Sequence, residues 1–308
     1  MSRRRAWGEV EGLGPLPLKR EGGPRRTQRE RRETPMGQTE FRDALIGVME
    51  GKEHWADSAF PKDVETPKMR YHFRDEYAVF VKPFPNYLRG VLKQLPKAEK
   101  GKPDKFRKIR KDLKGNIKEE EEGGIAQQIL AEKYGHPVPR RSHAELFLDI
   151  PRDPAFGFDV GDFDTATLDS RAQAYRSFLT DATHNRGWEV GAAVSTLFLE
   201  GNKRERSVFH KKFGIKPWLG KPLHEHPLHV HKGVALRSLG LIEAHHELDS
   251  AVGAHRLAAW NMILKGIPKE KRAEVLASMK EALTYWQAWR DEVAEACGVK
   301  KSNEDRGQ

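Results

Sequence analysis

The sequence predicts an all-α protein whose ordered part forms one helical domain. Apolar residues recur at helical spacing almost everywhere from residue 38 on, and no stretch of useful length alternates as a strand does. Of the 308 residues, 37% are hydrophobic and 32% charged, and no apolar run approaches the roughly 20 residues that span a bilayer. The single cysteine, Cys297, excludes a disulfide framework and a Cys-based metal site. We therefore expect a cytoplasmic protein without a membrane segment.

The expected helices follow one another along the chain. Three apolar stripes mark the first three: Phe41, Leu45, Val48 and Met49; Phe73, Tyr77, Phe80, Phe84 and Leu88; Phe106, Ile109, Leu113 and Ile117. Pro83 and Pro85 should kink or end the second of these helices. Further helices are expected over 143–150, 167–183, 188–200, 234–265 and 269–297, the last ending at Gly298. Loops are expected over 95–104, 122–141, 151–165 and 213–230.

The net charge of +10 is concentrated at the N-terminus. Residues 1–35 hold ten Lys and Arg against five Glu, which is +5 and half of the excess. Because this segment has almost no apolar periodicity, we expect residues 1–37 to be a disordered basic arm before an ordered domain at 38–298 and a frayed tail at 299–308. Such an arm suits contact with nucleic acid or acidic lipid, but no nucleic-acid motif accompanies it, which favours an uninformative tail.

Candidate functional residues are ionisable side chains that continue an apolar stripe, because a buried charge needs a partner or a metal ion. Glu120 follows Leu113 by seven residues and lies on the stripe of its helix, whereas Glu119 and the other neighbouring acids fall to the sides. A solvated acidic run at a frayed helix end explains Glu120 as well. His143 precedes the apolar residues of 146–150 at helical spacing, where a core histidine is the ordinary alternative to a ligand.

Two glutamates flank the segment 188–200, which is small and apolar throughout, as a central buried helix would be. Glu189 and Glu200 are eleven residues apart and share a helix face. Glu200 is either a buried acid in need of a partner or the point where the helix leaves the core. Glu189 also suits the first turn of a helix, whose dipole favours an acid there.

A further segment, 244–260, combines histidines with a carboxylate. His245 and Asp249 are spaced i, i+4 on one apolar face, and His255 follows beyond Gly253. This pattern is as typical of a metal site as of a His-rich surface helix.

Together these segments offer three carboxylates and three imidazoles as metal ligands: Glu120, His143, Glu200, His245, Asp249 and His255. The set suits iron or manganese better than calcium, which prefers oxygen ligands alone, or structural zinc, which thiolates usually enclose. Facing helices that supply Glu and His to the interior of a bundle build di-iron carboxylate sites. Iron held in this way has open positions for dioxygen, which implies oxidative chemistry.

Six stretches in the same order carry a resemblance to a known family: FRDEYAVFVKPFP (73–85), NIKEEEEGG (116–124), SHAELFL (142–148), GWEVGAAVSTLFLEG (187–201), EHPLHVHKG (225–233) and AHHELDSAVGAHRLAAW (244–260). The sequence resembles the heme-oxygenase-like di-iron oxidase and oxygenase superfamily, close to iron-containing redox enzymes and related in fold to pyrroloquinoline-quinone synthase and thiaminase-type proteins. The resemblance implies a bundle of about seven core helices, two Fe²⁺ ions as cofactors and dioxygen as co-substrate.

Within this resemblance the metal ligands come from three regions of the chain. In this sequence the first region supplies Glu120 and His143, the second Glu200, and the third His245, Asp249 and His255. The long separation of Glu120 and His143 requires a loop between them. His255 comes six residues after Asp249, where the family has three, so that a π-bulge or a break near Gly253 is needed to bring it back to the shared face.

Three hypotheses for function follow from these observations. The first is a non-heme iron oxidase or oxygenase that acts on a small metabolite. In it, Glu189 and Tyr77 are candidates for residues that contact and orient the metal ligands, although core packing is the ordinary explanation for Tyr77. The second is a cofactorless oxidase or thiaminase-like hydrolase whose His and Glu side chains are the acid–base groups. The third is a non-enzymatic protein that binds a ligand in the bundle and nucleic acid through its arm.

The partners that we expect are a small-molecule substrate and an electron donor that the sequence does not name. We expect neither a membrane nor nucleic acid as a partner, and a homodimer is left open.

Overall fold

The computed structural model describes residues 36–60, 62–97, 104–203, 205–209, 223–251 and 254–301, apart from the side chains of 207–208, 246–251 and 254–255. Within these ranges the chain is helical and has no strand, which confirms the predicted all-α class. The expected basic arm falls outside the described residues up to residue 35, and so does the expected tail from residue 302 on. None of the helices in these ranges has the length and apolarity that crossing a membrane requires.

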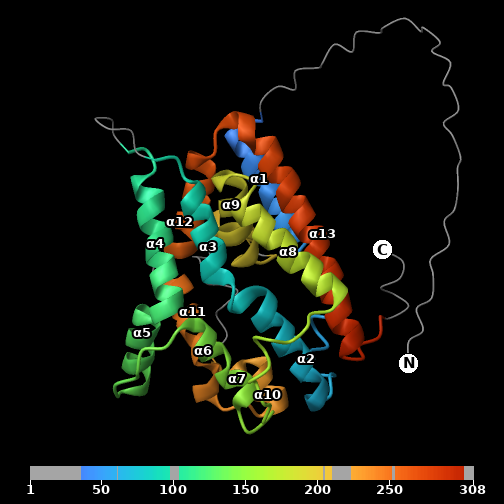
Figure 1. The fold of residues 1–308 in the computed structure, drawn as a ribbon. Coiled ribbons are helices and arrows are strands. Elements are labelled where there is room, and N and C mark those ends of the chain that lie inside the picture. The colour runs from blue at the N-terminus through green and yellow to red at the C-terminus, as the bar shows by residue number, and fades with distance from the viewer. Residues whose placement is uncertain are drawn as a thin grey trace, which may run out of the picture. The chain divides into compact units, whose positions relative to one another are not determined.

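Long helices build the core of the domain (Figure 1). The longest, α13 (Arg272–Ala296), packs against α8 (Ser170–His184), α1 (Gln38–Glu50) and α2 (Thr66–Glu76). Helix α8 also contacts α3 (Phe84–Gln94) and α9 (Trp188–Ala192). All residues of 190–198 are buried, which confirms that this small apolar segment is a central helix.

Two parts of the core are π-helical and continue a preceding α-helix. The first, η1 (Tyr77–Val81), follows α2, and the second, η2 (Ala193–Leu199), follows α9. A π-turn holds more residues than an α-turn and therefore changes the direction in which the following side chains point. The ends of both π-helices line one cavity. Pro83 and Pro85 lie where η1 gives way to α3, which confirms that they interrupt the expected helix.

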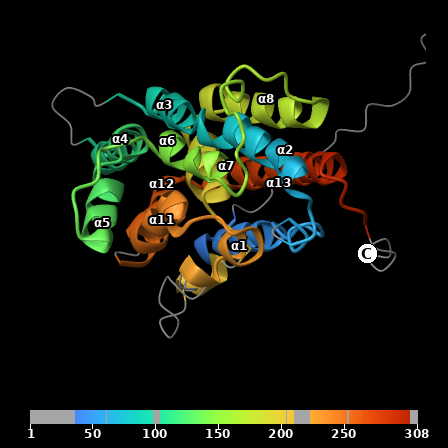
Figure 2. The same ribbon diagram turned by 90° about the horizontal axis from the view of Figure 1, so that it is seen from below.

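The helices that complete this cavity lie near one another on one side of the domain (Figure 2). Helix α4 (Arg107–Glu122) contacts α3 and α6 (His143–Phe147), and α11 (Gly240–Ala251) contacts α5 (Gly124–Tyr134) and α6. The remaining segments are α7 (Asp149–Arg152), α10 (Pro227–Lys232), α12 (Ala254–Gly266) and the 3₁₀ turns η3 (Glu205–Phe209), η4 (Leu223–Glu225), η5 (Leu236–Leu239) and η6 (Lys269–Lys271). The site is thus built where α4, α6 and α11 meet.

The chain changes direction between α4 and α5 at Gly123. This glycine has a φ of 58°, and a Cβ at this position would lie 1.9 Å from the carbonyl oxygen of Arg141. Only glycine allows both the left-handed backbone and this close approach. The missing side chain lets the end of α4 lie directly next to the segment that leads into α6.

Several helix boundaries differ from the expected ones. The expected number of about seven core helices is too small, because several expected helices are broken into shorter pieces such as η5, α11 and α12. The expected loop 122–141 contains α5, whose buried apolar residues are only Ala126 and Leu130, too few for a clear helical stripe. The expected loops 151–165 and 213–230 likewise contain part of α7 and of α10. The break proposed near Gly253 lies outside the described residues.

Candidate metal centre

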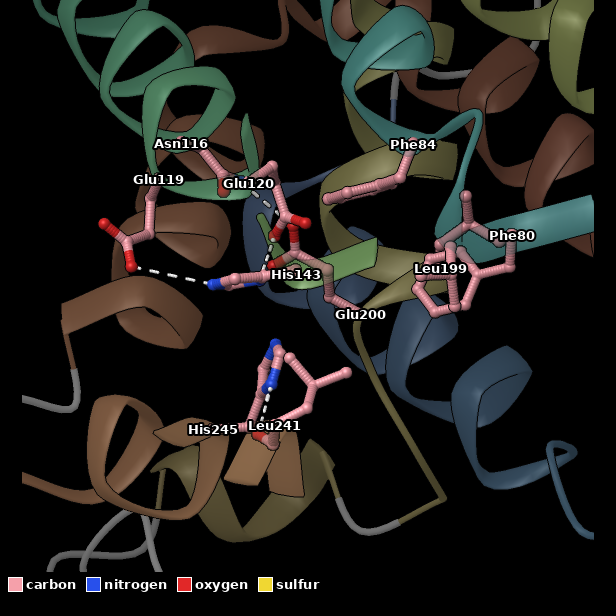
Figure 3. A pocket seen from close by; sticks show the side chains of 11 residues that line it. Phe80, Phe84, Asn116, Glu119, Glu120, His143, Leu199, Glu200, Leu241 and His245 are labelled. Atoms are coloured by element: carbon pink, nitrogen blue, oxygen red, sulfur yellow. Dashed lines mark hydrogen bonds and ion pairs between the residues drawn. The ribbon is translucent and has the colours of Figure 1, made fainter. Parts of the chain in front are cut away.

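Three side chains from three separate helices meet in the interior. One ligand atom each of Glu120, His143 and His245 lies within 4.8 Å of the other two. Glu120 comes from the last turn of α4, His143 from the start of α6 and His245 from the middle of α11. Figure 3 shows Glu119 and Glu120 approaching the His143 ring from two sides, with His245 across from them.

Local sequence fixes His143 at the first position of α6. Ser142 is the N-cap: its hydroxyl accepts from the backbone N–H of Glu145 at 3.2 Å, and the Glu145 carboxylate accepts from the Ser142 N–H at 2.7 Å. This reciprocal pair is a capping box, which defines where the helix begins. His143 is therefore buried at a helix start, with 4% of its surface exposed.

The His143 ring lies between two carboxylates. Its Nδ1 is 3.0 Å from Glu120 Oε1, and its Nε2 is 3.6 Å from Glu119 Oε1. Neither contact has the geometry of a hydrogen bond, and among the described residues both buried nitrogens lack a hydrogen-bond partner. A buried polar atom in this state needs an explanation, and an ion that takes the nitrogen lone pair is one.

Glu119 is fixed by the backbone of the next helix. Its carboxylate accepts the N–H groups of Ile125 and Ala126, at 2.9 Å and 2.8 Å, at the start of α5. Burial raises the pKa of Glu119, but its interaction with His143 and these two N–H groups outweigh burial and lower the pKa to about 2. Glu119 therefore remains a carboxylate that faces His143.

The two carboxylates also act on His143. Burial lowers the pKa of His143, but the interactions with Glu119 and Glu120 outweigh burial and raise the pKa to about 9. Without a metal ion the ring is thus an imidazolium at neutral pH. With a metal ion the proton on the coordinating nitrogen is displaced, since a ligand histidine must be neutral there.

His245 stands next to His143 with its ring turned edge-on. The two ring centroids are 4.9 Å apart at an interplanar angle of 67°. His245 Nδ1 lies 2.9 Å from the carbonyl oxygen of Leu241, one helical turn earlier. Because a carbonyl only accepts, this contact places the proton on Nδ1 and the ring lone pair on Nε2.

Glu200 lines the same cavity but is not one of the three clustered residues. The side-chain amide of Asn116 donates to its Oε1 at 3.0 Å. Asn116 is one turn before Glu120 on α4, so that one helix positions both acids. This arrangement was not apparent from the sequence, where Asn116 carries no helical signal of its own.

Two basic side chains, the half-buried Lys52 and the buried Arg256, hold the end of η2 directly before Glu200. Lys52 Nζ donates to the carbonyls of Phe198 and Gly201, both at 2.7 Å. Arg256 donates to the carbonyls of 196–197 at 2.8 Å and 3.1 Å, and lies 4.0 Å from the Glu200 carboxylate. The last carbonyls of a helix have no N–H donor within the helix, and these two side chains donate to them instead. The backbone that carries Glu200 is thereby fixed.

The cavity between these residues has a volume of about 180 Å³. Its polar wall is formed by Asn116, Glu119, Glu120, His143, Glu200 and His245, and its apolar wall by Phe80, Val81, Phe84, Leu199 and Leu241. Converging polar groups on one side and apolar, partly aromatic residues on the other are the kind of lining that small-molecule sites have.

The structure brings together four of the six expected ligands. Glu120, His143 and His245 form the cluster and Glu200 lines its cavity, while the side chains of Asp249 and His255 lie outside the described residues. Glu189 and Tyr77 do not line the cavity. Tyr77 stacks on Phe147 instead, with ring centroids 6.1 Å apart, as core packing would have it.

The donor set fits a transition-metal ion. Two ligands on opposite sides of one ion, each at about 2.1 Å, are about 4.2 Å apart, so that a cluster within 4.8 Å closes on an ion by small side-chain movements. Two imidazoles and one carboxylate on one face of the ion are the ligand set of non-heme Fe²⁺ oxygenases, and catalytic Zn²⁺ accepts it too.

Comparison with known proteins supports the fold. No protein-family model and no curated protein sequence matches the chain. Among solved structures it is similar to a TenA homolog from Pseudomonas syringae pv. tomato, with a TM-score of 0.56 and 14% sequence identity, over 85% of this chain and 97% of that one. The chain therefore has a helical fold similar to that of this TenA homolog.

Proposed function

We propose that this protein is an enzyme that holds Fe²⁺ on Glu120, His143 and His245 and uses dioxygen to oxidise a small molecule. The observation that carries the proposal is the meeting of these three side chains, from α4, α6 and α11, next to a cavity of about 180 Å³. Bound Fe²⁺ supplies the one-electron chemistry that dioxygen needs. Glu200, on the same cavity, offers a further carboxylate for a second ion.

The residues around the ligands have defined tasks in this proposal. Glu119 faces Nε2 of His143 and so orients the ring with Nδ1 toward Glu120. Leu241 does the same for His245 through its carbonyl oxygen. The apolar wall of the cavity keeps water away from the reacting atoms and contacts the apolar part of a substrate.

A second candidate function, acid–base catalysis without a metal ion, has an observation of its own. His143 between Glu119 and Glu120 has a pKa raised to about 9, so that a metal-free site contains an imidazolium beside carboxylates. Such a pair is able to donate and accept protons in a hydrolysis. The similarity in fold to a TenA homolog favours this thiaminase-like alternative.

Oxygen consumption separates the two functions. Protein freed of metal and reloaded with Fe²⁺ under anaerobic conditions is expected to consume dioxygen when the buffer is aerated, faster than the same concentration of free Fe²⁺. His143→Ala, which removes a ligand, should lower the rate to that of free Fe²⁺. If the wild-type protein reacts no faster than free Fe²⁺, the metal-free alternative is the better account.

A further inference from the structure

A second, larger cavity lies alongside α4 and has a volume of about 390 Å³. It is bounded by α4 on one side and by α12 and the end of η2 on another.

This larger cavity adjoins the metal cavity. Asn116, Glu119 and Glu200 line both of them. The Asn116–Glu200 hydrogen bond of 3.0 Å therefore stands at the boundary between the two spaces. A molecule in the larger cavity has one end within reach of the proposed metal ligands.

The larger cavity is elongated along α4. Its lining residues Lys108, Lys111, Gly115 and Glu119 recur at spacings of three and four and so lie on one face of the helix. Eleven residues separate the first from the last, which is about 16 Å along the axis at 1.5 Å per residue. Gly115, in the middle, leaves open space where a Cβ would otherwise point.

The chemistry of the lining changes along this length. Lys108 and Lys111 are exposed at the outer end, and Asp112 offsets one of these charges because it pairs with Lys108 at 2.6 Å. The middle is lined by apolar side chains without an aromatic ring, namely Leu113, Ile125, Ala258, Ala259 and Met262. The inner end has the two carboxylates Glu119 and Glu200, which disfavour an anion there.

We infer that the larger cavity is the substrate channel and that it takes an elongated aliphatic molecule with an anionic group at its outer end. The anion contacts Lys111 and Lys108, the aliphatic chain follows the apolar lining past Gly115, and the far end reaches the metal cavity. This inference rests on the proposed function. A carboxylate, a phosphate or a sulfonate satisfies the same outer end.

The test is equilibrium binding of n-decanesulfonate, measured by calorimetry on full-length protein kept metal-free with a chelator. The sulfonate keeps its charge at any working pH and differs from a carboxylate in not being a strong iron ligand. We expect saturable binding at one site, and weaker binding of n-decyltrimethylammonium, which has the same chain and the opposite charge. Because no metal is present, failure to bind iron leaves this result unaffected.

Variants locate the binding. Lys108→Ala/Lys111→Ala should weaken decanesulfonate binding by about 3- to 10-fold, as the loss of two exposed cations does. The control Lys280→Ala removes an exposed lysine from α13, which supplies no residue to this cavity, and should leave binding unchanged. Gly115→Phe should abolish binding by filling the channel, while Gly115→Ala should bind like wild type. Equal binding of the cationic probe, or undiminished binding by Gly115→Phe, would overturn the inference.

Binding of decanesulfonate and binding of Fe²⁺, measured separately, distinguish the two proposals. If decanesulfonate binds as expected but Fe²⁺ does not, the channel stands and the iron enzyme does not. If Fe²⁺ binds but decanesulfonate shows no saturable binding, the channel is wrong and the metal centre is unaffected.

Discussion

Replacement of Glu119 by alanine is expected to destabilise the metal-free protein by about 3 kcal/mol at pH 7. Two ways of estimating the loss agree on this order of magnitude. The substitution leaves two backbone N–H groups at the start of α5 without their charged acceptor, each worth about 1.5–3 kcal/mol, and water compensates at the exposed Ile125 but not at the buried Ala126. The lowering of the Glu119 pKa from 4.5 to about 2 likewise corresponds to about 3 kcal/mol.

The stabilisation that Glu119 provides depends on pH. Because the folded-state pKa of Glu119 is lowered, its contribution is complete above the unfolded pKa of 4.5 and is lost as pH falls toward 2. Glu119→Ala should therefore differ from wild type by about 3 kcal/mol at pH 7 and by little near pH 2.

Urea unfolding at several pH values measures this difference. The matched control is Glu122→Ala. Among the described residues, the half-exposed carboxylate of Glu122 makes a surface ion pair with Lys118 at 3.7 Å, and its loss should cost less than about 0.5 kcal/mol. The reasoning is refuted if Glu119→Ala unfolds within about 0.5 kcal/mol of wild type at pH 7, or if its deficit is the same at low pH.

Two further predictions concern the backbone and the acid stability of the fold. In thermal unfolding, Gly123→Ala should destabilise the protein far more than the control Gly135→Ala. Both glycines have a positive φ, of 58° and 71°, but of the two only a Cβ at 123 would meet a backbone atom. The control should therefore cost only the strain of its backbone conformation, about 1–2 kcal/mol. An equal cost would show that the Arg141 contact is unimportant. Burial and the charge of Arg290 lower the pKa of His72 from 6.5 to about 3, and stability is therefore lost as pH falls through this interval. His72→Gln should flatten the free energy of unfolding there by up to about 1.4 kcal/mol per pH unit, and an unchanged slope would contradict this.

Helical periodicity predicts the residues that lie on one stripe of one helix. Glu120 and His143 both continue apolar stripes, and in the structure Glu120 Oε1 lies 3.0 Å from His143 Nδ1. The same reasoning sends Glu119 to the side of α4, yet it is buried with 6% of its surface exposed. The reason is α5, which folds back after Gly123 and covers that side of α4. The two glycines after the acidic run were the signal that a second helix begins there.

Contacts between distant segments were beyond reach of a single sequence. The hydrogen bond from Asn116 to Glu200 joins α4 to the residue after η2, and neither residue's spacing indicates the other. The π-helical turn of η2 also has no composition that separates it from an α-helix, because 190–198 is buried on all sides. The choice of Glu189 as a supporting residue assumed that one face continues to Glu200. In the structure Glu200 lines the cavity and Glu189 does not.

The central claim is that Glu120, His143 and His245 bind a metal ion together, and anaerobic titration of the metal-free protein with Fe²⁺ tests it most directly. Calorimetry should show at least one tight site per chain in wild type and in the control Glu122→Ala. That site should be lost in Glu120→Ala, His143→Ala and His245→Ala, each checked for native helix content by circular dichroism. Wild-type protein that binds no Fe²⁺, or folded variants that bind it as well as wild type, would contradict the claim.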